Sequence, residues 1–413
     1  MKRLTTLFFV AFSNISMASP VVSEITRYSV EVPAALSPDA KGFPIGLGSG
    51  LTFSRRLPGG QLEFFMLTDR GPNYPAPTPG HIVAFAENFS PKIFRVVVDP
   101  HKSRAKAVEA IPITYKGKAI SGFDTRINQT NQETIVNRYG HSLPARFGLD
   151  TESLARLPNK DFVVGDEYGP SINFVDHRSG AMVKRFLPGK GLPDALAQRR
   201  FNRGFEALCV GKNNRIYVLL EGTLALSEQT AKTARFIRML ELDPSNGKTR
   251  MFAYPIDFEA YSDSSQVKIG DLAALDENQF LLVEQGKGRD GLYRNKIYKI
   301  DLSSAENIAE RALLNKQELE FSDEEELHTT KMLTKSLLFD PRRKGWHEDK
   351  LEGLTVIDHK TIAISNDNDF GIKGMKQIST TCGKHLCSIY RPILRTHNQA
   401  TQLWIIRFDN TIF

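Results

Sequence analysis

The sequence predicts an all-β protein, a β-propeller with five legible blades, and three observations lead to this fold class. Hydrophobic residues make up 41% of the 413 residues and charged residues 24%, which is typical of a globular chain with a full core. The 30 glycines and 21 prolines are spread along the chain and favour many turns. A strand–turn–strand unit recurs along the whole chain, which favours a propeller over two separate β-sandwiches.

Each copy of the unit joins two short apolar strands. The first strand begins beside a small or acidic residue, and the second ends in acidic residues or glycine, a pattern of strands bounded by turn formers. The five copies lie at residues 50–73, 150–169, 204–222, 270–286 and 351–371. Third strands that end in Asp follow at residues 93–99, 172–176, 236–243, 297–301 and 403–409.

The segments between these units complete the predicted ring. Residues 25–32 form an N-terminal strand that we expect to pair with the last blade and close the propeller. Residues 116–148 are polar and turn-rich and predict an insertion. Residues 303–344 are charged and helical in pattern, so they predict a second insertion, with a sixth blade as the alternative. One domain then spans residues 19–413.

The first eighteen residues have the pattern of a secretory signal peptide. Lys2 and Arg3 precede an apolar stretch at residues 4–12, and Ser16 and Ala18 form a small-x-small cleavage site. The apolar stretch is too short to span a bilayer. A retained anchor or a buried N-terminal strand is the alternative. We expect the mature protein to be a monomer in the periplasm or outside the cell, without a membrane span.

Nucleic acid is not an expected partner. The net charge of +7 is small and dispersed, and the sequence has no basic helix and no alternation of aromatic and basic residues.

Export allows disulfides, and the spacing of the cysteines suggests one. Cys382 and Cys387 enclose a short polar segment, and a bridge between them would contribute about 2 kcal/mol on the chain-entropy model. Two free thiols are the alternative. Cys209 lies in an apolar run and is interpreted as a small buried hydrophobe. Three cysteines without a histidine pair at ligand spacing do not indicate a zinc site.

Acidic residues occupy the two places of the unit that meet in a propeller. The innermost strand of a blade starts, and the second strand ends, on the same face beside the central channel. The strand starts carry Glu152, Glu206, Asp271 and Glu352, and the strand ends carry Asp69, Asp166, Glu167, Glu221, Glu284, Asp367 and Asp369. We therefore expect these carboxylates to converge on one mouth of the channel.

A cluster of carboxylates at one mouth predicts a bound cation. Carboxylates that lie close together raise one another's pKa unless a cation lies among them. Oxygen ligands without Cys or His favour Ca²⁺, and Mg²⁺ less often. The predicted metal ligands are Glu206, Glu221, Asp271, Glu284, Glu352 and Asp367.

Two other interpretations of the acidic residues stay open. A basic residue lies near each acidic group, and such residues could form a structural ion-pair ring without metal: Arg70, Arg146, Arg203, Lys268 and Lys350. The acids could also be ordinary solvated turn residues.

Several of these motifs, in this order, resemble the phytase-like family, which is named for the esterase-like activity of phytase. They are Gly48-Ser49-Gly50-Leu51-Thr52, Thr68-Asp69-Arg70-Gly71-Pro72-Asn73, Asp150-Thr151-Glu152-Ser153-Leu154, Asp166-Glu167-Tyr168-Gly169-Pro170, Gly204-Phe205-Glu206-Ala207-Leu208 and Glu352-Gly353-Leu354-Thr355. The likeness covers roughly residues 43–409. It implies hydrolysis of phosphate esters or other esters, and similarity to a Ca²⁺-dependent propeller phytase would imply a metal-bridged phosphate site.

The predicted function is that of an exported, metal-dependent hydrolase of small-molecule phosphate or other esters at the acidic mouth. Glu152 or Asp69 is the candidate general base, and Arg70 and Arg203 are the candidate substrate-binding residues. The sequence has no Gly-x-Ser-x-Gly elbow, so a serine hydrolase is not indicated. The alternatives are a lactonase-like hydrolase and a non-catalytic propeller that binds a ligand or protein and holds a structural metal.

Overall fold

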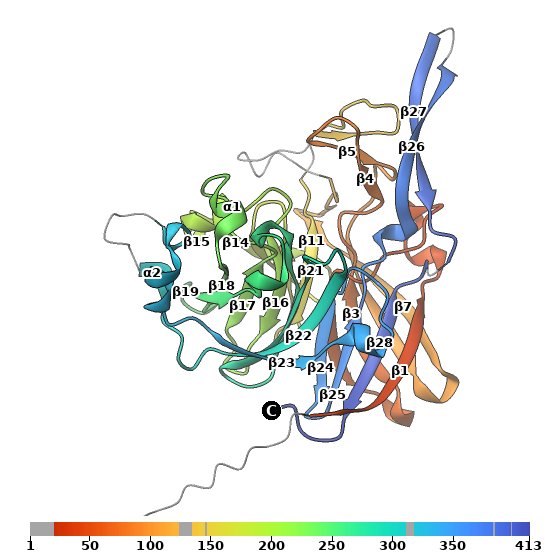
Figure 1. Cartoon of the computed structure of the whole chain (residues 1–413). Coiled ribbons are helices and arrows are strands. Elements are labelled where there is room, and N and C mark those ends of the chain that lie inside the picture. Colours follow the sequence, from red (N-terminus) through yellow and green to blue (C-terminus); the bar gives the residue numbers. More distant parts are fainter. Residues whose placement is uncertain (1–19, 124–133, 145–146, 311–317, 383–384, 398) are drawn as a thin grey trace, which may run out of the picture.

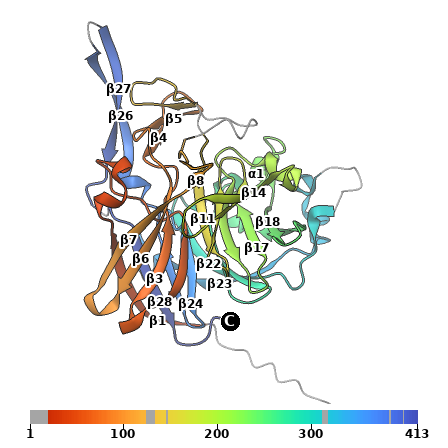
Figure 2. The same cartoon turned by 180° about the vertical axis from the view of Figure 1, so that it is seen from behind.

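The computed structural model describes residues 20–123, 134–144, 147–310, 318–382, 385–397 and 399–413. The predicted signal peptide and Arg146 lie outside these residues. The described residues form five antiparallel blades around a central channel, and a short parallel pairing joins the outer strands of the first and last blades into one eight-stranded sheet, so the predicted β-propeller is confirmed (Figures 1 and 2).

The five blades follow one another along the chain. Blade one contains β2 (Leu51–Arg56), β3 (Leu62–Leu67), β6 (Lys92–Asp99) and β7 (Arg104–Pro112), and blade two contains β11 (Thr151–Arg156), β12 (Phe162–Asp166), β13 (Ser171–Val175) and β14 (Met182–Pro188), extended by β15 (Gly191–Leu192). Blade three contains β16 (Phe205–Val210), β17 (Ile216–Leu220), β18 (Phe236–Leu242) and β19 (Thr249–Pro255), and blade four contains β20 (Val267–Ala274), β21 (Gln279–Lys287), β22 (Tyr293–Asp301) and β23 (Thr334–Phe339). Blade five contains β24 (Gly353–Asp358), β25 (Thr361–Ser365), β28 (Gln402–Phe408) and β1 (Val22–Glu31).

The N-terminal strand closes the ring, as the sequence predicts. β1 is antiparallel to β28, with Val22 opposite Phe408 and Ser29 opposite Gln402. The inner strands β2, β11, β16, β20 and β24 contact one another in this order, and β24 contacts β2. The last blade is therefore made from both ends of the described chain.

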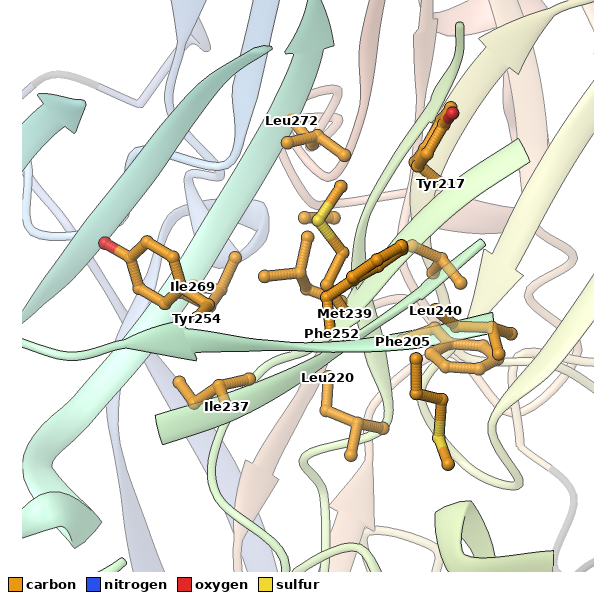
Figure 3. Packing of buried hydrophobic residues seen from close by; sticks show 14 of the residues in the cluster. Phe205, Tyr217, Leu220, Ile237, Met239, Leu240, Phe252, Tyr254, Ile269 and Leu272 are labelled. Atoms are coloured by element: carbon orange, nitrogen blue, oxygen red, sulfur yellow. The ribbon is translucent and has the colours of Figure 1, made fainter. Parts of the chain in front are cut away.

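Apolar side chains from facing blades fill the spaces between the blades. The largest cluster joins blades two to four and includes Phe205, Tyr217 and Phe252 (Figure 3). Further clusters join blades four and five, blades one and two, and blades one and five. Because each blade is covered on both faces, a second strand such as β17 is buried at every residue. This is why second strands read as continuous apolar runs and not as alternating patterns.

Two insertions stand above one face of the propeller (Figures 1 and 2). The first is a small cap sheet of β4 (Asn73–Pro75), β5 (His81–Ala84) and β10 (Thr134–Val136), and a short ribbon of β8 (Thr114–Tyr115) and β9 (Lys118–Ala119) lies nearby in the sequence. The second is the hairpin of β26 (Ile372–Cys382) and β27 (His385–Leu394), inserted between β25 and β28. An apolar cluster joins the hairpin to the cap sheet, so the two insertions support each other.

Residues 303–344 contain short helical segments and the outer strand of blade four. α2 (Glu324–His328) begins with a capping box between Asp323 and Glu326, and β23 follows and pairs with β22. The described part of this segment therefore forms no sixth blade. Another short helix, α1 (Thr230–Thr233), lies in blade three between β17 and β18. Among the described residues, no helix has the length and hydropathy to cross a membrane.

Candidate functional site

A pocket of about 200 Å³ opens where the inner strands begin and the second strands end. Its lining includes eight acidic residues: Asp69, Asp150, Glu152, Glu167, Glu206, Glu221, Glu352 and Asp369. The basic residues of the lining are Arg70, Lys268 and Lys350, so carboxylates exceed basic groups by five. β4 and the base of β26 contribute Tyr74, Pro75 and Ile372 to one side of the pocket.

Two β-bulges hold Glu152 and Glu206 in the pocket lining. Each is the second residue of an inner strand, β11 or β16, and at each the pairing with the second strand shifts in register. A bulge leaves the extra residue outside the ladder and changes the direction of its side chain. The same local irregularity in two blades therefore directs two carboxylates toward the channel mouth.

A close approach between neighbouring blades brings the second-strand acids to the same place. Glu167 follows β12 and Glu221 follows β17, and the Glu221 amide donates a hydrogen bond to the Gly204 carbonyl at 2.8 Å. A Cβ atom on Gly204 would lie 2.1 Å from the Glu167 carbonyl oxygen, so only glycine permits this contact. The packing of blade three on blade two thus sets the spacing between Glu167 and the acids of blade three.

The carboxylates form one continuous chain of three groups, and in each group the oxygen atoms lie within 4.8 Å of one another. The groups are Asp69, Asp150 and Glu152; Glu152, Glu206 and Glu352; and Glu167, Glu206 and Glu221. Glu152 and Glu206 each belong to two groups and link the three. All seven residues are buried.

Basic side chains neutralise some of these acids. Lys268 Nζ bonds to Glu221, and Arg70 Nη1 lies 3.4 Å from Asp150 Oδ2. Lys350 Nζ lies 2.7 Å from Asp367 Oδ2 and 2.8 Å from Asp369 Oδ1. Although burial opposes ionisation, Lys268 lowers the pKa of Glu221, and Lys350 lowers that of Asp367. These pairs form part of the predicted ion-pair ring.

Three central carboxylates lack such partners. In the described part of the chain, no basic group and no hydrogen-bond donor contacts the side-chain oxygens of Glu152, Glu167 or Glu206. Burial and the neighbouring carboxylates raise the pKa of all three well above the usual value. Burial also raises the pKa of Glu352, to about 8, although Lys350 opposes the rise. A cation among these oxygens would offset their buried negative charge, so the donor set fits a hard divalent ion.

Asp69 is bonded locally and faces the pocket. Its Oδ1 accepts a hydrogen bond from the Gly71 amide at 2.8 Å. Burial, Asp367 and Asp150 raise its pKa well above the usual value. Arg70, the next residue, donates its backbone N–H to Asp150 Oδ1 at 3.1 Å, so Asp150 holds both the backbone and the side chain of Arg70.

Two predicted metal ligands lie outside the pocket lining. Asp271 accepts backbone hydrogen bonds from Leu354 at 2.7 Å and from Leu272 at 2.8 Å, and so joins β20 to β24. Glu284 accepts hydrogen bonds from the Tyr254 hydroxyl at 2.7 Å and from Lys335 at 2.9 Å. Partners from the chain therefore surround both carboxylates.

Arg203 and Asp367 also lie behind the lining. Arg203 donates to the carbonyl oxygens of Val267 at 2.8 Å and Ser265 at 3.1 Å, and its Nε lies 3.3 Å from Glu221. Asp367 pairs with Lys350. Among the predicted site residues, the structure brings Asp69, Arg70, Glu152, Glu206, Glu221 and Glu352 together in one pocket.

Three acids of the lining were not among the predicted ligands or bases: Asp150, Glu167 and Asp369. Glu167 and Asp369 were expected at the mouth as strand-end acids, whereas Asp150 was not. Asp150 stands just before β11, and Glu167 just after β12. The alternation of side chains could have separated Glu167 from Asp166, because neighbouring residues at a strand end point in opposite directions. Asp166 accepts hydrogen bonds from Ser171 at 2.8 Å and Arg185 at 3.2 Å and lies outside the lining.

The three cysteines lie in two different parts of the fold, one in an inner strand and two in the hairpin. Cys209 is a free, buried thiol on β16, as the sequence predicts. Cys382 and Cys387 lie near the tip of the β26–β27 hairpin, where their backbone is described. Their side chains lie outside the described part, so the disulfide stays a prediction.

The chain is similar to one known protein family in sequence and to several solved structures in fold. The family model described as "Phytase-like: Esterase-like activity of phytase" matches residues 44–370. No curated protein sequence matches the chain. Among solved structures, the α-L-arabinofuranosidase PaAbf62A from Podospora anserina is 11% identical with a TM-score of 0.38, over 94% of this chain and 97% of its own. The virginiamycin B lyase from Staphylococcus aureus is 7% identical with a TM-score of 0.32, over 93% and 99%.

Proposed function

The chain belongs to the phytase-like family, and on this premise we propose that it hydrolyses phosphate or other esters in the acidic pocket with a bound divalent cation. The observation that carries the proposal is the group of buried carboxylates without basic partners: Glu152, Glu167 and Glu206. Buried ionised carboxylates need a compensating charge or a proton. Ca²⁺ is the first candidate because every donor in the group is an oxygen atom.

Glu152, Glu206 and Glu352 are the residues that would hold the cation. Their oxygens lie within 4.8 Å of one another, and the neighbouring groups could complete a coordination shell from blades one to three. When bound, the cation supplies Lewis-acid polarisation of the ester oxygen and lowers the pKa of a water molecule.

The other residues of the pocket would move the proton and orient the substrate. The described lining contains no Ser, Thr, Cys or His, so it offers no hydroxyl, thiol or imidazole of these types as nucleophile. Asp69, or Glu152 where it does not hold the cation, would accept the proton of the attacking water, since both carboxylates line the pocket. Arg70, held in place by Asp150, would bind an anionic oxygen of the substrate.

We also propose that the protein works as an exported monomer. The support is the signal-peptide pattern of residues 1–18. The phytase-like family match is consistent with this location.

A hydrolysis screen tests the proposal. The purified protein is incubated with p-nitrophenyl phosphate, p-nitrophenyl acetate and simple lactones, each with Ca²⁺ and with chelator. We expect turnover of at least one ester class with Ca²⁺ and little with chelator. Turnover of lactones alone would favour the lactonase-like alternative.

Matched glutamine variants assign the activity to the pocket. Glu206→Gln removes a charge from the group that lacks basic partners, so it should reduce both Ca²⁺ affinity and turnover. Glu241→Gln is the control, because Glu241 is also buried in blade three but is paired with Arg215 at 2.5 Å and Arg250 at 2.6 Å. Stabilisation by Ca²⁺ without turnover of any ester would contradict the hydrolase and favour a binding propeller with structural metal. No effect of Ca²⁺ would favour the ion-pair ring.

A further inference from the structure

The hairpin of β26 and β27 is a basic arm beside the mouth of the pocket. It projects beyond the blades, away from the end of the molecule that carries the C-terminus (Figures 1 and 2). Ile372 at its base lines the pocket. Residues 372–397 contain no acidic residue, whereas Lys or Arg occupies positions 373, 376, 384, 391 and 395.

One face of the hairpin is used for packing. Met375, Tyr390 and Leu394 pack against the apolar cluster of the cap sheet, which includes Val83 and Val136. The Tyr390 amide also donates a hydrogen bond to the Arg138 carbonyl at 2.7 Å. These contacts fix which face of the hairpin turns toward the molecule.

The opposite face, which we call the outer face, consists of Lys376, Ile378, Ile389, Arg391 and Ile393. Lys376 lies directly opposite Arg391, and Ile378 lies opposite Ile389. The two basic residues are exposed, and Ile393 is 37% exposed. No ion pair links Lys376 or Arg391 to an acidic residue within the described ranges.

This arrangement costs the hairpin stability instead of adding to it. Like charges directly opposite each other on a β-ladder repel. The exposed Ile393 and the half-buried Ile378 and Ile389 add apolar surface beside them. A partner with anionic groups beside an apolar region would offset both the charge repulsion and the exposure of apolar surface.

We propose that the outer face docks on the surface of a bilayer that contains anionic lipids. Anionic headgroups would pair with Lys376 and Arg391, and the isoleucines would reach the boundary of the acyl region. The outer face carries no amide or carboxylate side chain, so it suits a chemically uniform surface better than a partner read by specific hydrogen bonds. Docking would hold the mouth of the pocket close to the membrane, and it does not depend on the proposed hydrolysis.

Vesicle flotation tests this docking. The purified protein, in chelator so that no cation bridges the acidic pocket to lipid, is mixed with phosphatidylcholine vesicles and with vesicles that also contain phosphatidylglycerol. We expect flotation only with the anionic vesicles, and less of it at high salt because screening weakens the headgroup pairs. The double variant K376E/R391E should bind at least about thirtyfold more weakly, since two basic residues contribute about 1 kcal/mol each at such a surface and the glutamates would also be repelled by it.

A charge-matched variant separates the outer face from the net charge. Lys190 and Lys212 are exposed in turns of blades two and three, so K190E/K212E changes the net charge equally and should float like the wild type. I393S should reduce the binding that persists at high salt. An equal loss of flotation in K376E/R391E and K190E/K212E overturns the proposal, and so does a wild type that does not float with the anionic vesicles. Self-association that depends on Lys376 and Arg391 would also overturn it, in favour of a second copy as partner.

Discussion

Glu352 connects the charge of the pocket to the stability of the fold. Burial is the first cause that raises its pKa to about 8, and Asp367 adds to the rise. Its usual pKa is 4.5, so between pH 4.5 and about 8 the folded chain holds a proton that the unfolded chain releases. The stability that this proton contributes is complete below pH 4.5 and is lost as the pH rises toward 8.

We therefore predict that, in chelator, the melting temperature falls as the pH rises from about 5 to 8. Glu352→Gln cannot titrate, so its melting temperature should fall less steeply over the same range. Thermal unfolding monitored by circular dichroism in a series of buffers measures both slopes. Equal slopes for the wild type and the variant would contradict the raised pKa of Glu352.

Asp271 has a structural role in this geometry, although the sequence suggested a ligand. Its two oxygens accept the N–H groups of Leu272 and Leu354, so it ties two inner strands together. We predict that Asp271→Asn lowers the unfolding free energy by about 1–3 kcal/mol, because an amide N–H would face a backbone N–H. The rise in melting temperature with Ca²⁺ should not change. A variant that keeps its stability but loses the Ca²⁺ response would show that Asp271 is a ligand after all.

At the scale of the elements, the sequence predicted which strands carry the site but not which way each acid points. Glu152 and Asp271 both lie near the start of an inner strand, yet Glu152 lines the pocket and Asp271 joins backbones. Both acids lie where the pairing with the second strand shifts in register, but the oxygens of Asp271 are taken up by the N–H groups of Leu272 and Leu354. Such a shift leaves no clear signal in one sequence because it depends on how the partner strand is registered. Basic residues such as Lys268 and Lys350 were predictable as neighbours of the acids in sequence, whereas the pairing of Lys268 with Glu221 of the preceding blade was not.

Gly204 tests how blade packing sets the site. A Cβ at this position would lie 2.1 Å from the Glu167 carbonyl oxygen, which is a backbone atom and cannot rotate away. We predict that Gly204→Ala costs about 1–3 kcal/mol of stability through overpacking, and that it weakens Ca²⁺ binding by separating Glu167 from Glu206. Calorimetric titration and thermal unfolding measure the two effects.

Gly374 provides the matched control for this substitution. A Cβ there would meet Ile393 at ordinary contact distances, 3.6 Å from Cδ1 and 3.8 Å from Cβ. Gly374→Ala should therefore change neither stability nor Ca²⁺ binding appreciably. If Gly204→Ala also changed neither stability nor Ca²⁺ binding, the close approach of blades two and three would not be needed for either property.

At the scale of the whole molecule, the repeat predicted the ring, its five blades and its closure by the N-terminal strand. Repetition made this possible, because each unit places its strands by the same rule. The insertions follow no repeat, and the sequence pattern predicted no strand where the β26–β27 hairpin lies. The orientation of the hairpin depends on packing against β4, β5 and β10. Of these, β4 lies nearly 300 residues earlier in the chain.

Closure by β1 makes the stability of every blade depend on the first described strand. Tyr28 and Val30 of β1 are 4% and 3% exposed, and Arg27 stacks over Trp404 at 4.4 Å. Without β1, β28 would become an open edge, and at least about 3 kcal/mol of apolar burial would be lost. We predict that a chain starting at Ser19 unfolds cooperatively and responds to Ca²⁺, whereas a chain starting at Val32 melts far lower and loses the response.

A peptide supplied in trans makes this last prediction specific. Because β1 is held by its ladder with β28 of blade five and by a short parallel pairing with β7 of blade one, a synthetic peptide of residues 20–32 should bind the chain that starts at Val32 and restore part of its melting temperature. A peptide in which Tyr28 and Val30 are replaced by Ser keeps the backbone donors but loses the buried side chains, so it should restore little. Full stability of the shortened chain without any peptide would mean that the inner strands alone hold the ring closed.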